Sequence, residues 1–527
     1  MNTSTTHRKI THYALLFLLV INYTCYSQNI LISSQNTPEE PSIKIDPKHP
    51  NIVIAASNID NYYLSTDTGR TWSIHRLSSE YGVWGDPCIE VDTNSNFYFF
   101  HLSNPLAGGN WIDRIVCQKT SNNGATWNNG TYTGWNGTKA QDKQWCAVDR
   151  KQNILYLTWT QFDAYGSANP TDSSTVLFSK SVDEGTTWTT PKRINTVAGD
   201  CIDGDNTVEG AVPTVGLNGE VYVSWAGPSG LVFNKSLDGG TTWLAHETPI
   251  DPMPTGWEYS IEGINRCNGL PITVCDVSNS PYRGTIYVNW SDQRNGATNT
   301  DILLAKSTDA GNTWSAPIKV NNDNTNTQQF LSWLTVDPVT GYLYCVFYDR
   351  RNYTDTKTDV YVAISTDGGN SFINKKISDS PFIPQDDIFF GDYTNITAYN
   401  GIIRPIWTRL HNQQLSVWTA LLDFNTLTSS IDEKTEEKDY ITMETYPNPA
   451  TEEVFVCYKL PKKSKIDIVL YDASGKVIQT ILQGEIQEIG KHLQKINLKP
   501  FDLSAGSYYL ELKINDKIKK SRVIVIK

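Results

Sequence analysis

Short stretches in which apolar and polar residues alternate recur along most of the chain, and polar turns rich in glycine, asparagine and aspartate separate them. In one typical unit the stretches cover residues 144–149, 154–160 and 175–180, and a fourth begins at Trp188. Alternation with a period of two, together with many aromatic residues, predicts β-strands. Because four such strands recur in unit after unit, the pattern predicts an all-β fold.

One eight-residue phrase recurs six times, each time between the third and fourth predicted strands of a unit. The copies cover residues 65–72, 120–127, 181–188, 236–243, 307–314 and 365–372, at spacings of 55, 61, 55, 71 and 58 residues. The first copy reads Ser-Thr-Asp-Thr-Gly-Arg-Thr-Trp. Its aspartate can accept backbone N–H groups and its glycine can adopt a positive φ, so the phrase predicts a tight turn. A period of this size indicates radial repetition of a small sheet.

The phrase resembles the Asp-box, or bacterial neuraminidase repeat, of sialidase-like β-propellers. That resemblance implies an Asp-box β-propeller over residues 28–425, with the boxes as structural turns away from the active face. Residues 393–398, 402–407 and 415–422 form a last unit without a box, and residues 29–33 have no partners of their own. We expect this N-terminal strand to complete a seventh blade, which leaves no free sheet edge. A six-bladed ring, as in sialidases proper, is the alternative.

Residues 1–27 have the features of a secretory signal peptide. Arg8 and Lys9 precede an apolar run at residues 13–21, and Cys25 and Ser27 frame a cleavage site of the small-x-small kind. The apolar run is too short for a stable transmembrane span, and no other segment predicts one. A lipoprotein cysteine at Cys25 is the alternative.

A polar, charged stretch at residues 426–442 predicts a linker, and a different kind of sequence follows it. Residues 446–449 read Tyr-Pro-Asn-Pro, short predicted strands surround residues 470–476 and 503–509, and the chain ends in a basic segment. Residues 443–527 resemble the C-terminal sorting domain of the type IX secretion system of Bacteroidetes. The resemblance implies a small β-sandwich that directs export through the periplasm and outer membrane, with the secretion machinery as a partner. An immunoglobulin-like accessory module would have the same fold.

The composition narrows the possible partners. The 44 lysines and arginines against 56 aspartates and glutamates give a formal charge of −12, which does not favour nucleic acid or anionic membranes as ligands. Eight cysteines follow residue 27, and an even number in an exported protein permits disulfides. Their closeness in sequence predicts one pair, Cys267 with Cys275. We expect a secreted or cell-surface monomer.

Candidate site residues gather in the loops that precede the first strand and follow the second strand of each unit. Carboxylates, guanidinium groups and aromatic rings in such loops are typical of a carbohydrate site. The residues expected to contact a ligand are Arg294, Arg350, Arg351, Arg409, Trp84, Asp86 and Trp145. The alternative is that the repeated Asp-x-Arg phrases at 292–294 and 349–351 bridge neighbouring blades as salt-linked turns.

The sialidase resemblance also implies catalytic roles. In that family a tyrosine activated by a glutamate is the nucleophile and an aspartate is the acid or base, which would fall to Tyr393, Glu209 and Asp392. Asp292 and Asp349 are further candidate carboxylates. The first of the family's three substrate-binding arginines has no counterpart in residues 40–45, where the sequence reads Glu-Pro-Ser-Ile-Lys-Ile.

A second acidic cluster lies at residues 200–209. Its oxygen-bearing side chains could surround a calcium ion, although the spacing departs from an EF-hand loop. The predicted ligands are Asp200, Asp203, Asp205 and Asn206. A hydrated acidic turn is the alternative.

Taken together, these features predict a secreted carbohydrate-active propeller that resembles exo-sialidase-type glycoside hydrolases and acts on extracellular anionic or complex glycans. A non-catalytic propeller that binds glycan or protein at the cell surface is the alternative. A polysaccharide lyase is a third possibility.

Overall fold

The structure, a computed structural model, describes residues 29–105, 109–429, 443–446, 448–460, 463–488, 490–515 and 517–525. The chain divides into two compact units, Met1–Thr428 and Ser429–Lys527. The predicted signal peptide and residues 430–442 of the predicted linker lie outside the described residues. The start of that linker is not irregular, because helix α1 covers Phe424–Ser429.

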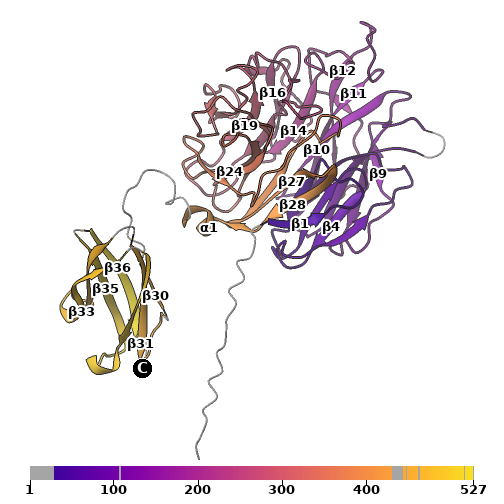
Figure 1. The fold of residues 1–527 in the computed structure, drawn as a ribbon. Helices are drawn as coiled ribbons and strands as arrows, with labels where there is room; N and C mark the ends of the chain where they lie inside the picture. The colour runs from indigo at the N-terminus through magenta and orange to yellow at the C-terminus, as the bar shows by residue number, and fades with distance from the viewer. Residues whose placement is uncertain are drawn as a thin grey trace, which may run out of the picture. The chain divides into compact units, whose positions relative to one another are not determined.

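Seven antiparallel sheets make up the described part of the first unit (Figure 1). In chain order, six of them are β2–β5 (Ser42–Ile45, Val53–Ser57, Asn61–Ser65, Ser73–Arg76), β6–β9 (Gly85–Val91, Phe97–Leu102, Ile115–Thr120, Thr131–Thr133), β10–β13 (Ala140–Asp149, Ile154–Phe162, Ser174–Ser181, Lys192–Arg193), β14–β17 (Glu209–Val215, Val221–Ala226, Leu231–Ser236, Thr248–Asp251), β18–β21 (Ile272–Cys275, Ile286–Asp292, Asp301–Ser307, Ile318–Lys319) and β22–β25 (Gln329–Val336, Leu343–Asp349, Asp359–Ser365, Ile373–Lys376). The last sheet contains β1 (Asn29–Ser33), β26 (Asn395–Tyr399), β27 (Ile402–His411), β28 (Gln414–Ala420) and β29 (Leu422–Asp423).

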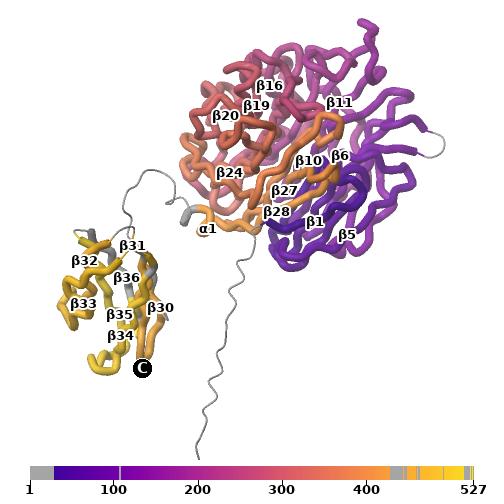
Figure 2. Tube along the Cα trace, viewed as in Figure 1, coloured from indigo at the N-terminus to yellow at the C-terminus, as the bar shows by residue number. Residues whose placement is uncertain are grey.

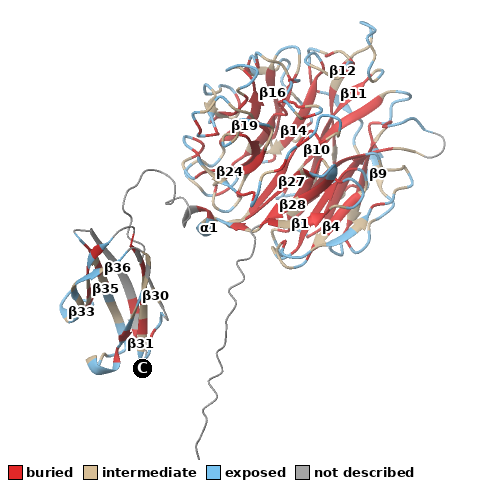
Figure 3. Cartoon of the chain, viewed as in Figure 1, coloured by how far each residue is buried: buried red, intermediate tan, exposed pale blue. Residues whose placement is uncertain are grey.

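The first strands of successive sheets contact one another in a ring. The order of contacts is β2, β6, β10, β14, β18, β22 and β26, and β26 contacts β2 again. This circular order is that of a β-propeller, with the first strands around the axis and the fourth strands outermost. The inner strands are buried while the turns are exposed (Figure 3). The predicted all-β propeller of four-stranded units is therefore observed.

The N-terminal strand joins the last sheet, as predicted. β1 pairs with β28, with Asn29 opposite Ala420, and the two ends of the unit lie side by side (Figure 2). Ile32 of β1 packs in a core cluster with Ile43 of the first sheet and Val417 of the last. One short strand thus links both sides of the ring closure.

The eight-residue repeat forms a hydrogen-bonded turn. In the first copy, the side chain of Asp67 accepts the N–H groups of Arg70 at 3.0 Å and Thr71 at 2.9 Å. The N–H of Gly69, whose φ is +85°, donates to Ser65 Oγ at 2.8 Å. The other copies repeat this arrangement with small variations, which explains why the phrase needs these residue types.

The aromatic residue that ends each repeat packs on the preceding sheet. Trp243 lies 5.0 Å from the ring of Phe178 on β12, and Trp314 lies 5.1 Å from that of Phe233 on β16. The same surface leaves no room for a side chain at Gly240, where a Cβ would lie 2.2 Å from the Phe178 ring. The repeats therefore pin adjacent sheets together.

We expect Trp188→Ala to lower stability without affecting ligand binding. The Trp188 side chain is half-buried, faces Phe100 at 5.9 Å, and donates from Nε1 to Thr131 Oγ1 at 3.0 Å. Its partial exposure reduces the expected loss to about 1–3 kcal/mol, below that of a fully buried tryptophan. Thermal and denaturant unfolding would measure the change. Trp135→Ala is the matched control, because Trp135 is 60% exposed. A Trp188→Ala protein that melts normally but loses its ligand would contradict the structural role of the repeats.

The second unit contains two sheets around one core. One sheet is β30 (Met443–Tyr446), β31 (Glu453–Leu460) and β34 (Gly490–Asn497), and the other is β33 (Val477–Gln487), β32 (Ser464–Tyr471), β35 (Gly506–Ile514) and β36 (Lys517–Val525). A 3-10 turn, η2, covers Lys499–Phe501. Alternate residues such as Val454, Val456, Ile466 and Ile468 are fully buried in the shared core. The unit is the predicted small β-sandwich.

Candidate functional site

The first strands of several sheets are bulged where they begin, at the same place in each. Strand pairing skips two residues at the start of β6, β10, β14 and β22. The residues in these gaps include Asp86, Lys143, Gly210 and Leu331, and all four have a positive φ, between 48° and 72°. Glu40, just before β2, has a φ of 52°. Positive φ at charged residues is typical of functional sites, and here it accompanies charged side chains that meet one another near the axis.

Lys143 lies at the centre of these charges. Its Nζ is 2.6 Å from Asp392 Oδ2 and 3.7 Å from Asp86 Oδ2, and the residue is 6% exposed. Burial lowers the pKa of Lys143, but the surrounding carboxylates, Asp392 and Asp86 foremost, raise it by more. The ammonium therefore stays charged and anchors the cluster.

Arg266 forms a second cationic contact with Asp392. Its Nε donates to Asp392 Oδ1 at 2.9 Å, and its Nη1 donates to Asp203 Oδ2 at 3.1 Å. Tyr165 donates its hydroxyl to the same Asp203 oxygen at 2.6 Å. Burial raises the pKa of Asp392, but Lys143 and Arg266 lower it by more, so Asp392 is a carboxylate at neutral pH.

Three further carboxyl groups, those of Glu40, Asp86 and Asp142, have pKa values that are shifted in opposite directions. Burial raises the pKa values of Glu40 and Asp142, and the negative charge of Asp86 raises both further. For Asp86, burial also raises the pKa, but Lys143 and hydrogen bonds with Glu40 and Asp142 lower it by more. Of the three, Asp86 is therefore the group that favours the ionised form.

A cavity of about 130 Å³ opens onto these groups. Glu40, Asp86, Asp142, Lys143, Tyr165 and Arg266 line it together with Trp84 and Trp111. The two tryptophans are 40% and 43% exposed, and their rings meet edge to face at 5.7 Å. We call this site the carboxyl cavity. It combines buried acids with an exposed aromatic surface.

Several predicted site residues lie at or beside the carboxyl cavity. Trp84 and Asp86 line it, and Asp392 binds both of its cationic side chains. Glu209 is fully buried nearby, where burial and the charge of Asp203 raise its pKa. Neither carboxylate oxygen of Glu209 has a hydrogen-bond partner among the described residues.

Tyr393 and Trp145 take a different place from the one predicted. With Trp333 they form an aromatic plug, in which the Trp145 ring lies 4.5 Å from Trp333 and 5.0 Å from Tyr393. Tyr393 is only 2% exposed, and burial and nearby carboxylates such as Asp86 raise its pKa well above the usual value. A phenol in that environment resists ionisation, so the structure does not favour Tyr393 as a nucleophile.

The two Asp-x-Arg phrases bridge sheets instead of reaching the axis. Arg294 pairs with Asp292 and with Asp251, which ends the outermost strand of the preceding sheet, at 2.6 Å. Arg351 pairs with Asp349 at 2.6 Å and donates to Asn322 at 2.8 Å, beyond the end of the preceding sheet. The structure thus favours the alternative that these phrases are salt-linked turns between blades. The carboxylates of Asp292 and Asp349 are both ion-paired with the arginines of their own phrases.

The other two predicted arginines are also structural. Arg409 donates to Ser380 Oγ at 2.7 Å, next to the preceding sheet. Arg350 is buried and donates to Thr358 at 3.0 Å and to the carbonyl of Glu262 at 2.8 Å. These two arginines therefore bond groups in neighbouring connections, and neither lines the carboxyl cavity.

The carboxylates of three predicted calcium ligands, Asp200, Asp203 and Asp205, accept hydrogen bonds from other residues. Asp203 binds Arg266 and Tyr165, Asp200 accepts the Thr207 hydroxyl at 3.0 Å, and Asp205 accepts the N–H of Glu258 at 2.8 Å. The carbonyl of Asn206 accepts the N–H of Asp200. Within the described part of the chain, no group of three or more histidine, cysteine, aspartate or glutamate side chains is placed to hold a metal ion.

The predicted disulfide is not formed. Cys267 and Cys275 are buried free thiols, and burial raises the pKa of each to about 12. Cys267 lies beside the carboxyl cavity, where the charge of Asp392 also raises its pKa, whereas Cys275 ends β18. The strand separates two residues that are close in sequence.

Sequence reasoning missed Arg266, Tyr165 and Trp111. Arg266 lies in the long connection between β17 and β18, which is residues 252–271. The 71-residue spacing between the fourth and fifth repeats, the longest of the five, marks this insertion in the sequence. An insertion in one unit of a radial repeat often carries site residues, so this long spacing was the sequence signal for Arg266.

Comparisons with known proteins identify the second unit. Residues 444–527 match the family described as the secretion system C-terminal sorting domain, which indicates export to the cell surface or secretion. No curated protein matches the chain. Among the helices that the structure describes, none is long and apolar enough to cross a membrane.

Solved structures similar to this chain include sialidases and a polysaccharide lyase. The Hadza microbial sialidase Hz136 is 12% identical over 72% of this chain and 75% of its own, with a TM-score of 0.39. A sialidase of Trypanosoma rangeli is 10% identical over 86% of this chain and 85% of its own, with a TM-score of 0.41. An ulvan lyase, described as a new family of polysaccharide lyase, is 14% identical over 75% of this chain and 96% of its own, with a TM-score of 0.46. At such identities and TM-scores these likenesses say nothing about the activity of this chain.

We expect removal of residues 443–527 to block export and leave the propeller folded. The two units are separately compact, and the sorting family matches only the second. Fractionation of the producing cells would find the shortened protein in the periplasm, with an unchanged melting temperature for the propeller. Normal appearance of the shortened protein in the medium would refute the export role.

Proposed function

We propose that the propeller is a secreted glycoside hydrolase that binds a glycan over Trp84 and Trp111 and cleaves it with Asp142 and Asp86. The observation that carries the proposal is the pair of adjacent carboxyl groups whose pKa values shift apart at the wall of a cavity. Glycoside hydrolysis needs one carboxylic acid and one carboxylate beside the scissile bond, and such opposite shifts mark the two roles.

The exposed tryptophans supply the binding surface. Trp84 and Trp111 present apolar ring faces at the carboxyl cavity, and Tyr165 extends the aromatic row at 5.4 Å from Trp111. Sugar rings have apolar faces that stack on such side chains, while their hydroxyls bond to the polar groups below. This arrangement holds a glycan with one glycosidic oxygen near the acids.

The chemistry assigns a distinct role to each charged side chain. Asp142 is protonated and gives its proton to the glycosidic oxygen as the bond to the anomeric carbon breaks. Asp86, kept ionised by Lys143, stabilises the positive charge that develops at the anomeric carbon, and the water that adds there gives a proton back to Asp142. Asp392 holds Lys143 and Arg266 in place, which keeps the ammonium within 3.7 Å of Asp86.

The charge of the cavity favours a neutral or amino sugar over an anionic one. Lys143 and Arg266 are the cations that line it in the described structure, and both are paired with aspartates. A sialic acid carboxylate would need unpaired arginines at this place. The expected preference for anionic glycans is therefore not supported at the carboxyl cavity.

A panel of neutral, amino and acidic glycans, assayed for both binding and release of reducing ends, tests the proposal. Cleavage of neutral or amino glycans, lost in Asp86→Asn, supports it. Trp84→Ala should weaken binding, while Trp135→Ala, also an exposed tryptophan, should not. Binding without cleavage of any glycan would favour the non-catalytic alternative, and unsaturated uronate products would favour a lyase.

A further inference from the structure

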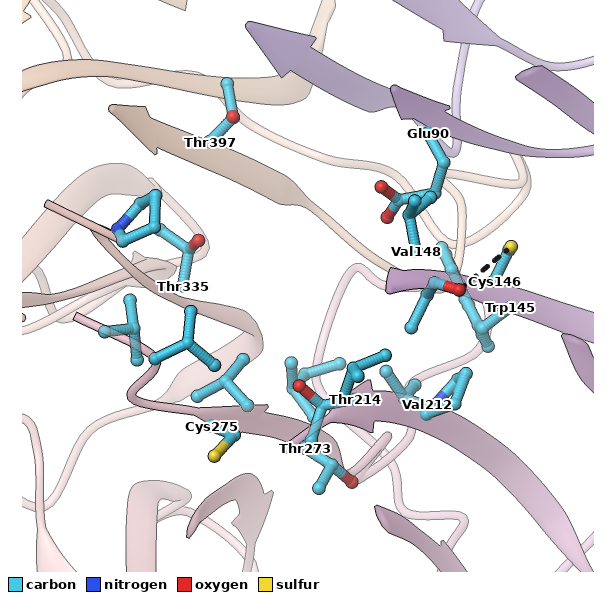
Figure 4. A pocket seen from close by; sticks show the side chains of 18 of the residues that line it. Glu90, Trp145, Cys146, Val148, Val212, Thr214, Thr273, Cys275, Thr335 and Thr397 are labelled. Atoms are coloured by element: carbon cyan, nitrogen blue, oxygen red, sulfur yellow. Dashed lines mark hydrogen bonds between the residues drawn. The ribbon is translucent and has the colours of Figure 1, made fainter. Parts of the chain in front are cut away.

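A second and larger cavity, of about 370 Å³, lies on the propeller axis (Figure 4). The inner strands form its walls, and Trp145 and Trp333 of the aromatic plug close one end. The carboxyl cavity is lined by residues at the starts of these strands, whereas this one reaches the turns that follow them. We call it the axial cavity. Its volume is within the range of ligand pockets, roughly 300–1,000 Å³.

The walls of the axial cavity are both apolar and hydroxylated. Thr214, Thr335 and Thr397 line it together with apolar residues such as Val212, and the carboxylate of Glu90 also lines it (Figure 4). Thr214 and Thr335 are only half-buried, although they lie on inner strands. Such a lining suits a molecule that has hydroxyl groups and apolar faces.

Three buried polar atoms of the lining have no hydrogen-bond partner among the described residues, and one of them is Oδ2 of Asp149, which ends β10. Asn395 is 2% exposed, and its side-chain oxygen accepts no hydrogen bond from the described residues. Trp145 Nε1, at the closed end, likewise donates none. Buried polar atoms are normally hydrogen-bonded, so this acceptor and this donor call for complementary groups on a molecule in the cavity.

The open end of the axial cavity carries three cations next to one carboxylate, that of Asp149. Arg150, Lys151 and Arg283 line it and are exposed, and among the described residues none lies within 4 Å of a carboxylate. Among the described residues, the charged groups of Lys151 and Arg283 donate to backbone carbonyls, for example from Arg283 to the Val277 oxygen at 3.0 Å. Arg283 also donates to the side-chain oxygen of Asn279. In a protein of formal charge −12, this local excess of positive charge over Asp149 favours an anion.

We propose that the axial cavity is a second ligand site, which binds a small hydroxylated carboxylate of the sugar-acid type. The carboxylate contacts the guanidinium and ammonium groups at the open end, and the hydroxylated body extends inward. A ligand hydroxyl donates to the Asn395 side-chain oxygen, and another accepts from Trp145 Nε1. The site is independent of the carboxyl cavity and of the hydrolase proposed above.

Isothermal titration of the full secreted protein with glucuronate and with glucose tests this site. We expect saturable binding of glucuronate, and glucose, which lacks the carboxylate, binds about tenfold more weakly. Arg283→Gln lowers glucuronate affinity about tenfold and leaves glucose binding unchanged. Arg70→Gln is the matched control, because it removes one exposed positive charge from a repeat turn far from the axis. Equal binding of inorganic phosphate and glucuronate would overturn the proposal, because it would show that only surface charge is recognised.

Two more variants test where glucuronate binds. Asn395→Leu should reduce both glucuronate and glucose binding, since the unpartnered oxygen is lost from the cavity wall. Asp86→Asn, in the carboxyl cavity, should leave glucuronate binding intact even though it abolishes hydrolysis. If Asp86→Asn changes glucuronate affinity and Arg283→Gln does not, the ligand occupies the carboxyl cavity and the axial site is refuted.

Discussion

Asp142→Asn should lower the rate of glycan cleavage by about 10²–10⁴-fold and leave glycan binding intact. The Asp142 carboxyl is the proposed proton donor, and an amide of the same shape cannot give up a proton. Trp84 and Trp111, which supply the binding surface, are unchanged. Reducing-end release and equilibrium binding, measured on the same glycan, separate the two effects.

The same variant should be at least as stable as the native protein at neutral pH. Burial and Asp86 raise the pKa of Asp142 above its ordinary value of 3.8. A carboxyl with a raised pKa in the folded state costs stability as the pH rises from that ordinary value through the raised one. Asparagine does not titrate, so the advantage of Asp142→Asn should grow as the pH increases through this range.

Asp355→Asn is the control, because Asp355 is exposed and its ion pair among the described residues is with Lys357. It should change neither cleavage nor melting. Full activity in Asp142→Asn would exclude this acid from the mechanism. Loss of both binding and melting temperature would show that the carboxyl cluster is structural.

The fold could be predicted because its information is local and repeated. Each repeat fixes its own turn through Asp67-type hydrogen bonds and its own contact with the preceding sheet through the terminal aromatic residue. Six copies of such a unit, with strands of period two between them, are consistent with one another and with a ring. Completion of the last sheet by residues 29–33 followed from the count of strands.

The site was harder to predict because contacts across the axis are not visible in sequence. Lys143 and Asp392 are 249 residues apart, yet their charged groups lie 2.6 Å apart. The loops at the starts of the inner strands were recognised as the site face, and Asp86 and Trp84 do lie there. Which loop residues turn toward the axis depends on the strand bulges, and no residue type marks a bulge in advance.

For the arginines, residues that the sequence suggested as ligand contacts turned out to contact neighbouring sheets. Asp292 and Arg294 recur as Asp349 and Arg351 at equivalent places, and this repetition is compatible with a shared ligand as well as with salt-linked turns between blades. Repetition in a propeller is more often a sign of the contact between neighbouring sheets, which each unit must make. Both phrases make that contact in the structure. A residue that occurs once, such as Arg266 in the longest insertion, was the better guide to the site.

Removal of residues 29–33 should abolish cooperative folding of the propeller. β1 covers the edge of β28, and without it the row of backbone groups from Val417 to Ala420 would be unpaired. Asn29 also bonds the carbonyl of Ile377 at 2.7 Å and the N–H of Asp379 at 2.8 Å, so the strand ties the last sheet to the one before it. Protein that begins at Ser34 should aggregate or melt without a cooperative transition, whereas protein that begins at Gln28 should melt normally.

Two single substitutions in β1 separate its packing from its backbone pairing. Ile32 is 4% exposed and packs between the first and last sheets, so Ile32→Ser should cost about 2–5 kcal/mol. Its neighbour Leu31 is 46% exposed, and Leu31→Ser should change the free energy of unfolding by less than about 0.5 kcal/mol. Unfolding in denaturant would measure both. Equal stability of the two variants, together with normal melting of the protein that begins at Ser34, would mean that the ring closes without this strand, because neither its side chains nor its hydrogen bonds would then contribute.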